Sequence, residues 1–194
     1  MPYTLSEKLL ALGLIVGLLA LVVLFNGVDR SCLKQFEDLE LAAVESTGKW
    51  QRTESADPMD DSTRVTLALE ADSDTSTTGE PVVLYVRCKQ RRLEVFIDWH
   101  EYLGGAGAGG DHYVLCRIGD AKAVNSRWSY STNSEASFYE GHKGLSVCQF
   151  VLALAQADQL VVEVAPFMEN PITAVFDTRG LRPHLASLLG ECSP

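Results

Sequence analysis

The feature that most constrains this chain is an apolar run of 17 residues, Leu9 to Phe25, that carries no charged side chain. A helix of that length rises about 25 Å, which is close to the shortest stretch that crosses a bilayer. Residues 4–6 and 26–28 extend the run to a comfortable length. We therefore expect a single N-terminal transmembrane helix that contacts the lipid bilayer through residues 4–28.

A cleaved signal peptide is the competing interpretation of this run. Signal cores are usually shorter, and the residues after Phe25 contain no Ala-x-Ala cleavage pattern. The sequence therefore favours an uncleaved signal-anchor over residues 1–29. Within it, Gly13 and Gly17 have the spacing that lets two membrane helices approach closely. They are candidate contacts of a homodimer through the transmembrane helix.

Composition excludes two broad classes of protein. The chain has 26 acidic and 16 basic residues, a formal net charge of −10, whereas nucleic-acid binding depends on an excess of Lys and Arg. Its hydrophobic fraction of 46% is enough for a core, which excludes a wholly disordered chain. We expect one folded domain and no nucleic-acid partner.

Beyond the anchor, the hydrophobic pattern first indicates a helical stalk over residues 30–48 and then changes to a period of two. Strands are expected at residues 50–55, 63–71, 82–88, 93–99, 112–118, 127–130, 136–139, 160–166 and 172–177, and helices at 145–157 and 180–189. Most connections are short, which predicts antiparallel pairing. The expected fold is mainly β (α+β), with one antiparallel β-sandwich-like domain over residues 49–194 and two short helices.

Two glycine motifs resemble sites of chemistry but lack the required context. Gly105-x-Gly107-x-x-Gly110 matches the dinucleotide fingerprint, yet a strand pattern follows it where a helix is needed, so a hairpin loop is favoured. The segment 144–148 resembles a nucleophile elbow, but Cys148 replaces its last glycine. Ser146 is predicted to be a helix N-cap instead.

The sequence predicts no metal, no cofactor and no catalytic residue. The histidines His100, His112, His142 and His184 contain no pair at i, i+3 or i+4, and there is no Cys-x-x-Cys. The acidic stretch over residues 54–61 lacks the pattern of a calcium loop.

One basic cluster is a candidate interaction site for an anionic partner; its members are Arg87, Lys89, Arg91 and Arg92. The alternative interpretation is a solubilising hairpin tip, which the intervening turn residues favour.

The order of several short motifs resembles that of a known family. The motifs are Trp50, Asp57-Pro58-Met59-Asp60-Asp61-Ser62, Val65-x-Leu67-x-Leu69, Leu84-x-Val86-Arg87-Cys88, Trp99-x-x-Tyr102-Leu103, Arg117-Ile118-Gly119, Trp128-Ser129-x-Ser131, Phe138, Val164-Ala165-Pro166-Phe167, Ala174-x-Phe176-Asp177-x-x-Gly180-Leu181 and Cys192. Together they resemble the TagO/VasI family of type VI secretion system-associated proteins over residues 50–192. The resemblance implies an accessory or adaptor role and no enzymatic activity.

This resemblance and the anchor lead to one main functional hypothesis. The chain is expected to be a single-pass protein of the bacterial inner membrane, with its C-terminal domain in the periplasm, that binds envelope or type VI secretion components. One alternative is a small-ligand or peptidoglycan-binding module that uses Trp50, Trp99 and Trp128, although the favoured interpretation of these tryptophans is that they are core residues of a β domain. Another is an envelope enzyme in which acids such as Asp61 and Asp98 meet in space.

Cysteine usage bears on the compartment. The five cysteines leave at least one thiol unpaired or paired between chains, and Cys32, just past the anchor, is expected to be that thiol. Cys88 follows Arg87 of the family pattern and Cys192 follows the last helix, so we predict a disulfide between them. Such a bond persists only outside the reducing cytoplasm, which favours the periplasm.

Overall fold

A computed structural model describes residues 32, 34–36, 48–59, 61–105, 110–142 and 144–192. The expected anchor over residues 1–29, with Gly13 and Gly17, lies outside the described residues, as does most of the expected stalk. In the part of the chain that is described, no helix is long and apolar enough to cross a membrane.

The described residues form ten strands and two main helices. The strands are β1 (Gln51–Ala56), β2 (Thr63–Glu70), β3 (Ser73–Asp74), β4 (Val83–Lys89), β5 (Arg92–Asp98), β6 (Asp111–Ile118), β7 (Val124–Tyr130), β8 (Ala136–Tyr139), β9 (Gln159–Val164) and β10 (Ile172–Asp177), and the helices are α3 (Val147–Leu154) and α4 (Arg182–Cys192). Every strand pair is antiparallel. The coarser prediction, a mainly β and antiparallel fold with few short helices, is confirmed.

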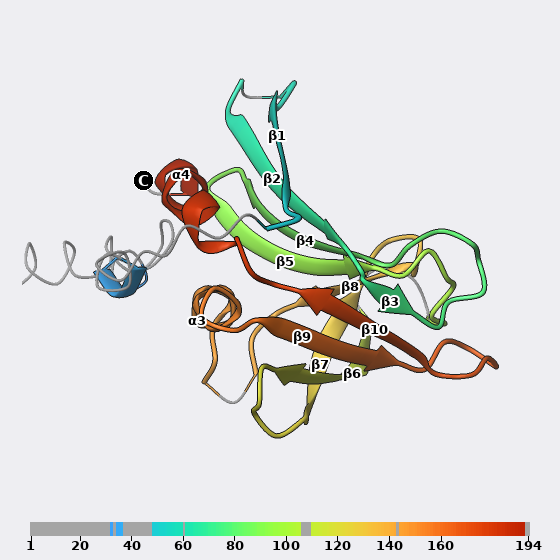
Figure 1. The fold of residues 1–194 in the computed structure, drawn as a ribbon. Coiled ribbons are helices and arrows are strands. Elements are labelled where there is room, and N and C mark those ends of the chain that lie inside the picture. Colours follow the sequence, from blue (N-terminus) through green and yellow to red (C-terminus); the bar gives the residue numbers. More distant parts are fainter. Residues whose placement is uncertain are drawn as a thin grey trace, which may run out of the picture.

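All ten strands belong to one sheet that curls on itself. Its order is β1-β2-β4-β5-β8-β7-β6-β9-β10-β3, so β2 and β3 lie toward opposite edges although only residues 71 and 72 separate them. The Asp72 amide donates to the Val175 carbonyl at 2.8 Å, which joins this step to β10. The layer β1-β2-β4-β5 therefore faces the layer β7-β6-β9-β10, with β8 between them at one side (Figure 1).

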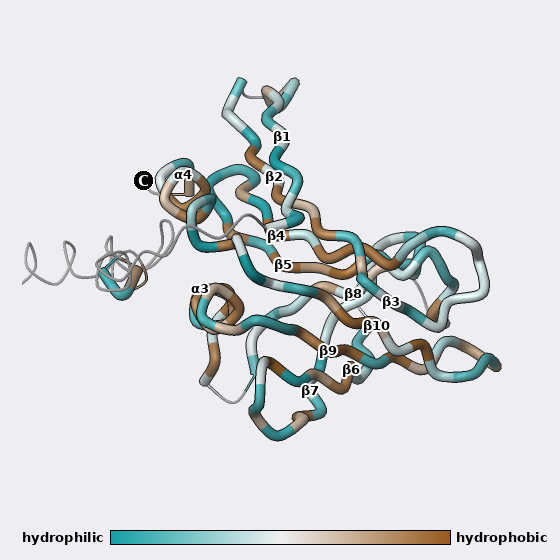
Figure 2. Tube along the Cα trace, viewed as in Figure 1, coloured by the Kyte–Doolittle hydropathy of each residue, from teal (hydrophilic) through white to brown (hydrophobic). Residues whose placement is uncertain are grey.

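The core lies between the two layers and follows from the period of two. Along β2, Val65, Leu67 and Leu69 are buried while their neighbours are half-buried or exposed. Burial of one such side chain contributes roughly 1.5–3 kcal/mol. Figure 2 shows hydrophobic positions along β4, β5 and β9 and on α3, with hydrophilic residues at many of the connecting turns.

The two helices close one end of the curled sheet, which we call the helix end (Figure 1). α4 contacts β2, β4 and β5, and α3 contacts β5. Ser146 caps α3 as predicted: the Gln149 amide donates to the Ser146 hydroxyl at 3.3 Å, and the Ser146 amide donates to the Gln149 side chain at 2.9 Å. This reciprocal cap explains why α3 begins at Val147 and not at the predicted residue 145.

At the other end, four loops close the sheet without a helix, and we call this the loop end. The strand pairing places the loops there together: Asp98 at the end of β5 pairs with Ala136 at the start of β8, and Val164 at the end of β9 pairs with Ile172. The four loops span residues 75–82, 99–110, 131–135 and 165–171. Because β6 begins at residue 111, the motif at Gly105, Gly107 and Gly110 precedes a strand, as predicted.

Candidate functional site

Large apolar side chains are exposed at the loop end. The exposed fractions are 52% for Tyr102, 58% for Phe167 and 87% for Met168. The Tyr102 hydroxyl donates to the Gly105 carbonyl at 3.3 Å, and a Cβ added at Gly104 would lie 2.8 Å from the Phe167 Cβ. Gly104 also has a φ of +79°, which glycine adopts more readily than other residues. Both the close approach of Phe167 and this φ therefore favour glycine at position 104. The two loops therefore form a joint surface, the apolar tip, made of Tyr102, Phe167 and Met168.

The charges around the apolar tip are acidic. The four loops contain no Lys or Arg, and their acidic residues are Glu80, Glu101, Glu135 and Glu169. His100 is the one basic side chain among them, and its Nδ1 lies 3.1 Å from the Glu80 carboxylate. A surface of one sign attracts charges of the other sign over about a Debye length. The loop end is thus suited to a cationic partner.

A buried hydrogen-bond network lies in the core near the apolar tip. The Trp99 indole donates to the Ser137 hydroxyl at 2.8 Å, and that hydroxyl lies 2.6 Å from Nε2 of His112. Tyr130 stacks on His112 with ring centroids 4.1 Å apart. Burial lowers the pKa of His112 to about 4, against a smaller opposing effect of Asp111. Ser137 is fully buried and already accepts a hydrogen bond from Trp99, so this contact supports the loop end and presents no nucleophile.

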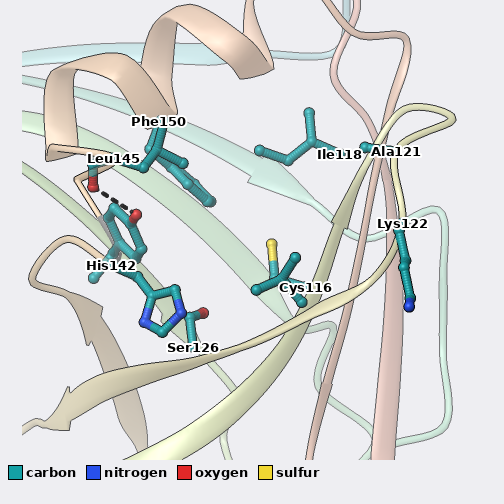
Figure 3. Close-up of a pocket in the computed structure, with 10 residues that line it drawn as sticks. Cys116, Ile118, Ala121, Lys122, Ser126, His142, Leu145 and Phe150 are labelled. Carbon is teal, nitrogen blue, oxygen red and sulfur yellow. Dashed lines mark hydrogen bonds between the residues drawn. The ribbon is translucent and has the colours of Figure 1, made fainter.

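A cavity of about 320 Å³ lies at the helix end, between α3 and the turn that joins β6 to β7 (Figure 3). Its apolar wall includes Ile118, Leu145 and Phe150. The Tyr139 hydroxyl donates to the Leu145 carbonyl at 2.8 Å, the dashed line in Figure 3. Burial raises the pKa of the Cys116 thiol to about 12, so this thiol is a poor nucleophile near neutral pH.

The predicted basic cluster does not form one free surface. The Arg87 guanidinium donates to the Glu94 carboxylate at 2.6 Å and lies over the Phe96 ring, 4.6 Å from its centroid. Phe96 in turn stacks between Tyr85 and Phe138, with centroids 4.7 Å apart on each side. Arg87 is therefore engaged on the outer face of the sheet.

The other members of the cluster lie at the β4–β5 turn at the helix end. Lys89 and Arg92 pair across the hairpin, and Gln90 and Arg91 form its two-residue turn. Both turn residues have positive φ, 50° and 58°, as a type I′ turn requires. This geometry fits the predicted hairpin tip.

The structure brings Cys88 and Cys192 together, as the sequence predicted. Their Cα atoms are 5.6 Å apart, within the range of disulfides, and they join β4 to α4.

The expectation that Cys32 is the unpaired thiol is wrong. Its Cα lies 6.0 Å from that of Cys148, at disulfide distance, and the free cysteine is Cys116. The reason is that Cys32 and Phe36 are buried in the hydrophobic core, whereas the sequence interpretation placed Cys32 away from the domain.

The alternative in which three tryptophans bind a ligand is not supported by their positions, which match the favoured interpretation of core residues. Trp50, Trp99 and Trp128 are all buried, and each indole N–H donates inside the domain, to Thr178, Ser137 and Ser126 respectively. They are core residues, and none presents a face to a sugar.

The two acids named for the enzyme alternative, Asp61 and Asp98, do not meet. Asp61 precedes β2 by two residues at the helix end, and Asp98 is the last residue of β5 at the loop end. Among the described residues, no group of three or more His, Cys, Asp or Glu side chains is placed to hold a metal ion.

Sequence reasoning missed both the apolar tip and the cavity. Tyr102 and Phe167 lie in segments more than sixty residues apart, and the cavity wall comes from β6, β7, β8 and α3. The absence of Lys and Arg from all four loops was a signal in the sequence, but it becomes visible only once the loops are known to gather. Comparison of the chain with protein-family models, with curated proteins and with solved structures finds no match.

Proposed function

We propose that this chain is a membrane-anchored periplasmic accessory protein of a bacterial type VI secretion system and that it acts by binding another protein. The proposal combines the apolar run over residues 9–25 with the resemblance of residues 50–192 to the TagO/VasI family. The enzyme alternative has less support, because the described residues hold its candidate acids, Asp61 and Asp98, at opposite ends of the sheet.

The cysteine pairs support the periplasmic location. Two pairs lie at disulfide distance, Cys32 with Cys148 and Cys88 with Cys192. Disulfides persist in the oxidising periplasm and are rare in the cytoplasm. Both pairs also close loops of more than 100 residues, so their formation would stabilise the domain substantially.

The observation that carries the binding proposal is the apolar tip. Tyr102, Phe167 and Met168 are large and more than half exposed, and their loops meet where Gly104 approaches Phe167. Exposed aromatic and Met side chains held on a rigid sheet are typical of protein-binding loops. Because the surrounding loops carry only acidic charge apart from His100, the partner we propose is a protein surface rich in Lys and Arg.

Site-specific photocrosslinking in cells tests this proposal. A photoreactive residue at position 168 is expected to crosslink to an envelope component of the secretion system. The yield is expected to fall as salt screens the acidic residues of the four loops, Glu80, Glu101, Glu135 and Glu169, which we call the acidic rim. The matched control is position 59 at the helix end, because Met59 is 86% exposed and Met168 is 87% exposed. Equal crosslinking from both positions, or crosslinks that exclude every secretion component, would contradict the proposal.

A further inference from the structure

The cavity at the helix end has features that the proposed protein-binding function does not use. Figure 3 shows the Cys116 sulfur, the Phe150 ring and the Ile118 side chain around a common space. Its volume is about 320 Å³. A water molecule takes up about 30 Å³ of liquid, so the cavity has room for on the order of ten heavy atoms.

Most polar groups in the wall are already satisfied inside the domain. Tyr139 donates to the Leu145 carbonyl at 2.8 Å. The Ser126 hydroxyl accepts from the Trp128 indole at 2.8 Å and donates to the Val114 carbonyl at 3.4 Å. These groups therefore need no hydrogen bond from an occupant of the cavity.

One buried polar atom in the wall has no partner. Nε2 of His142 is buried without a hydrogen bond to any described residue, and the Cys116 thiol is a weak donor in the same wall. A buried polar group without a partner costs about 1–3 kcal/mol. Because this nitrogen is buried, it does not open onto the cavity, and an occupant leaves it unpaired.

The wall offers no partner for a charged occupant. None of its residues is an Asp or Glu, which excludes a compensated cation. Lys122 is its only Lys or Arg, and Figure 3 shows its amine extending away from Cys116. An apolar pocket of this kind accepts small apolar molecules, whereas burial of an unpaired charge is costly.

We propose that this cavity binds a free, uncharged, compact apolar molecule of about the size of a medium-chain alcohol. Its apolar body lies among Ile118, Leu145 and Phe150. Binding is non-covalent, because the Cys116 thiol stays protonated. This inference is independent of the proposed role in secretion.

The test follows the alkylation of Cys116 in the full chain held in lipid nanodiscs, with 1-octanol as the probe at fixed free concentrations. A buried thiol reacts after local opening, so a ligand that binds the closed form slows the reaction by the factor 1 + [L]/Kd. We expect alkylation to be about tenfold slower at a free octanol concentration ten times Kd. Octanoate and octylammonium, which add a charge to the same chain length, are expected to leave the rate nearly unchanged.

Two exposed alanines in the β6–β7 turn give a matched pair of variants. Ala121 lines the cavity and Ala123 does not. Ala121→Phe is expected to block the cavity and abolish protection by octanol, whereas Ala123→Phe keeps it. Because neither alanine is buried, both variants should fold, and the fluorescence of the buried tryptophans verifies this.

Any of the following results would overturn the proposal. The first is no protection by octanol up to its solubility limit. The second is equal protection by octylammonium, or protection that persists in Ala121→Phe. The third is an alkylation rate that is already slow in nanodiscs and rises about tenfold in the bulky steroid detergent digitonin, because that result would assign the cavity to the chain of a membrane lipid.

Discussion

At the helix end of the sheet, α3 and α4 cover the core and both cysteine pairs tie distant segments together. At the loop end, four loops without a cysteine, a Lys or an Arg expose an apolar tip within an acidic rim. The helix end therefore serves stability, and the loop end presents exposed side chains. Cross-links and packed helices concentrate stability at one end, so the loops at the other can carry exposed side chains without endangering the fold.

The largest difference between the ends is expected from the cysteines. Replacing both Cys88 and Cys192 by alanine removes a cross-link between residues 104 apart in the sequence, which is expected to lower the free energy of unfolding by about 4 kcal/mol. Urea unfolding followed by tryptophan fluorescence measures this, because all three tryptophans are in the domain core.

The control for the cysteine variant is Phe167→Ser at the loop end, which is expected to cost less than about 0.5 kcal/mol because the side chain is largely exposed. Non-reducing peptide mapping verifies the pairs, with Cys116 alone alkylated after unfolding. Similar losses in the two variants would remove the contrast between the ends.

Two glycines allow the backbone constraints at the two ends to be compared. A Cβ added at Gly48 would lie 2.1 Å from the Arg179 carbonyl oxygen, so Gly48→Ala is expected to cost about 2–3 kcal/mol through overpacking at the helix end. Gly79 at the loop end has open space around it but a φ of +82°, so Gly79→Ala is expected to cost only about 1 kcal/mol. The same unfolding assay applies, and a larger loss in Gly79→Ala would show that the loop end is the more constrained of the two.

Acid is expected to act on the loop end through His112. Its pKa falls from 6.5 to about 4 in the fold, so the unfolded chain binds the proton more readily between these values. Stability is therefore full above pH 6.5 and declines as the pH falls toward 4. Allowing for partial exposure, we expect a loss of about 1–2 kcal/mol between pH 7 and 4.5. The variant His112→Gln keeps a side chain that can hydrogen-bond to Ser137. Its free energy of unfolding, measured at both pH values, should change with pH by about 1 kcal/mol less than that of the unmodified protein. An unchanged pH dependence would exclude His112 as the cause.

The smallest expected effect on stability comes from charge reversal at the surface. Glu169→Lys at the loop end and Asp120→Lys at the helix end are each expected to change the free energy of unfolding by less than about 0.5 kcal/mol. Only Glu169→Lys should weaken crosslinking from position 168, because it places a cation in the acidic rim. Equal weakening by Asp120→Lys would indicate a general effect of net charge.

The sequence alone determined the local elements, because the period of hydrophobic residues reports which side of a strand or helix is buried. Val65, Leu67 and Leu69 predicted β2, Ser146 predicted the start of α3, and residues 136–139 and 172–177 match β8 and β10. The family pattern also selected Cys88 and Cys192, which the fold brings together. Each of these signals lies within a few residues or within a quoted motif.

Only the tertiary structure decided which distant segments meet. The curl of the sheet brings the loop that carries Tyr102 against Phe167, buries all three tryptophans and places Cys32 beside Cys148. A period of two assigns residues to a face, but it does not say whether that face turns inward around a closed core. Cys116 illustrates the reason: its place in the cavity depends on α3, which begins more than thirty residues later in the chain.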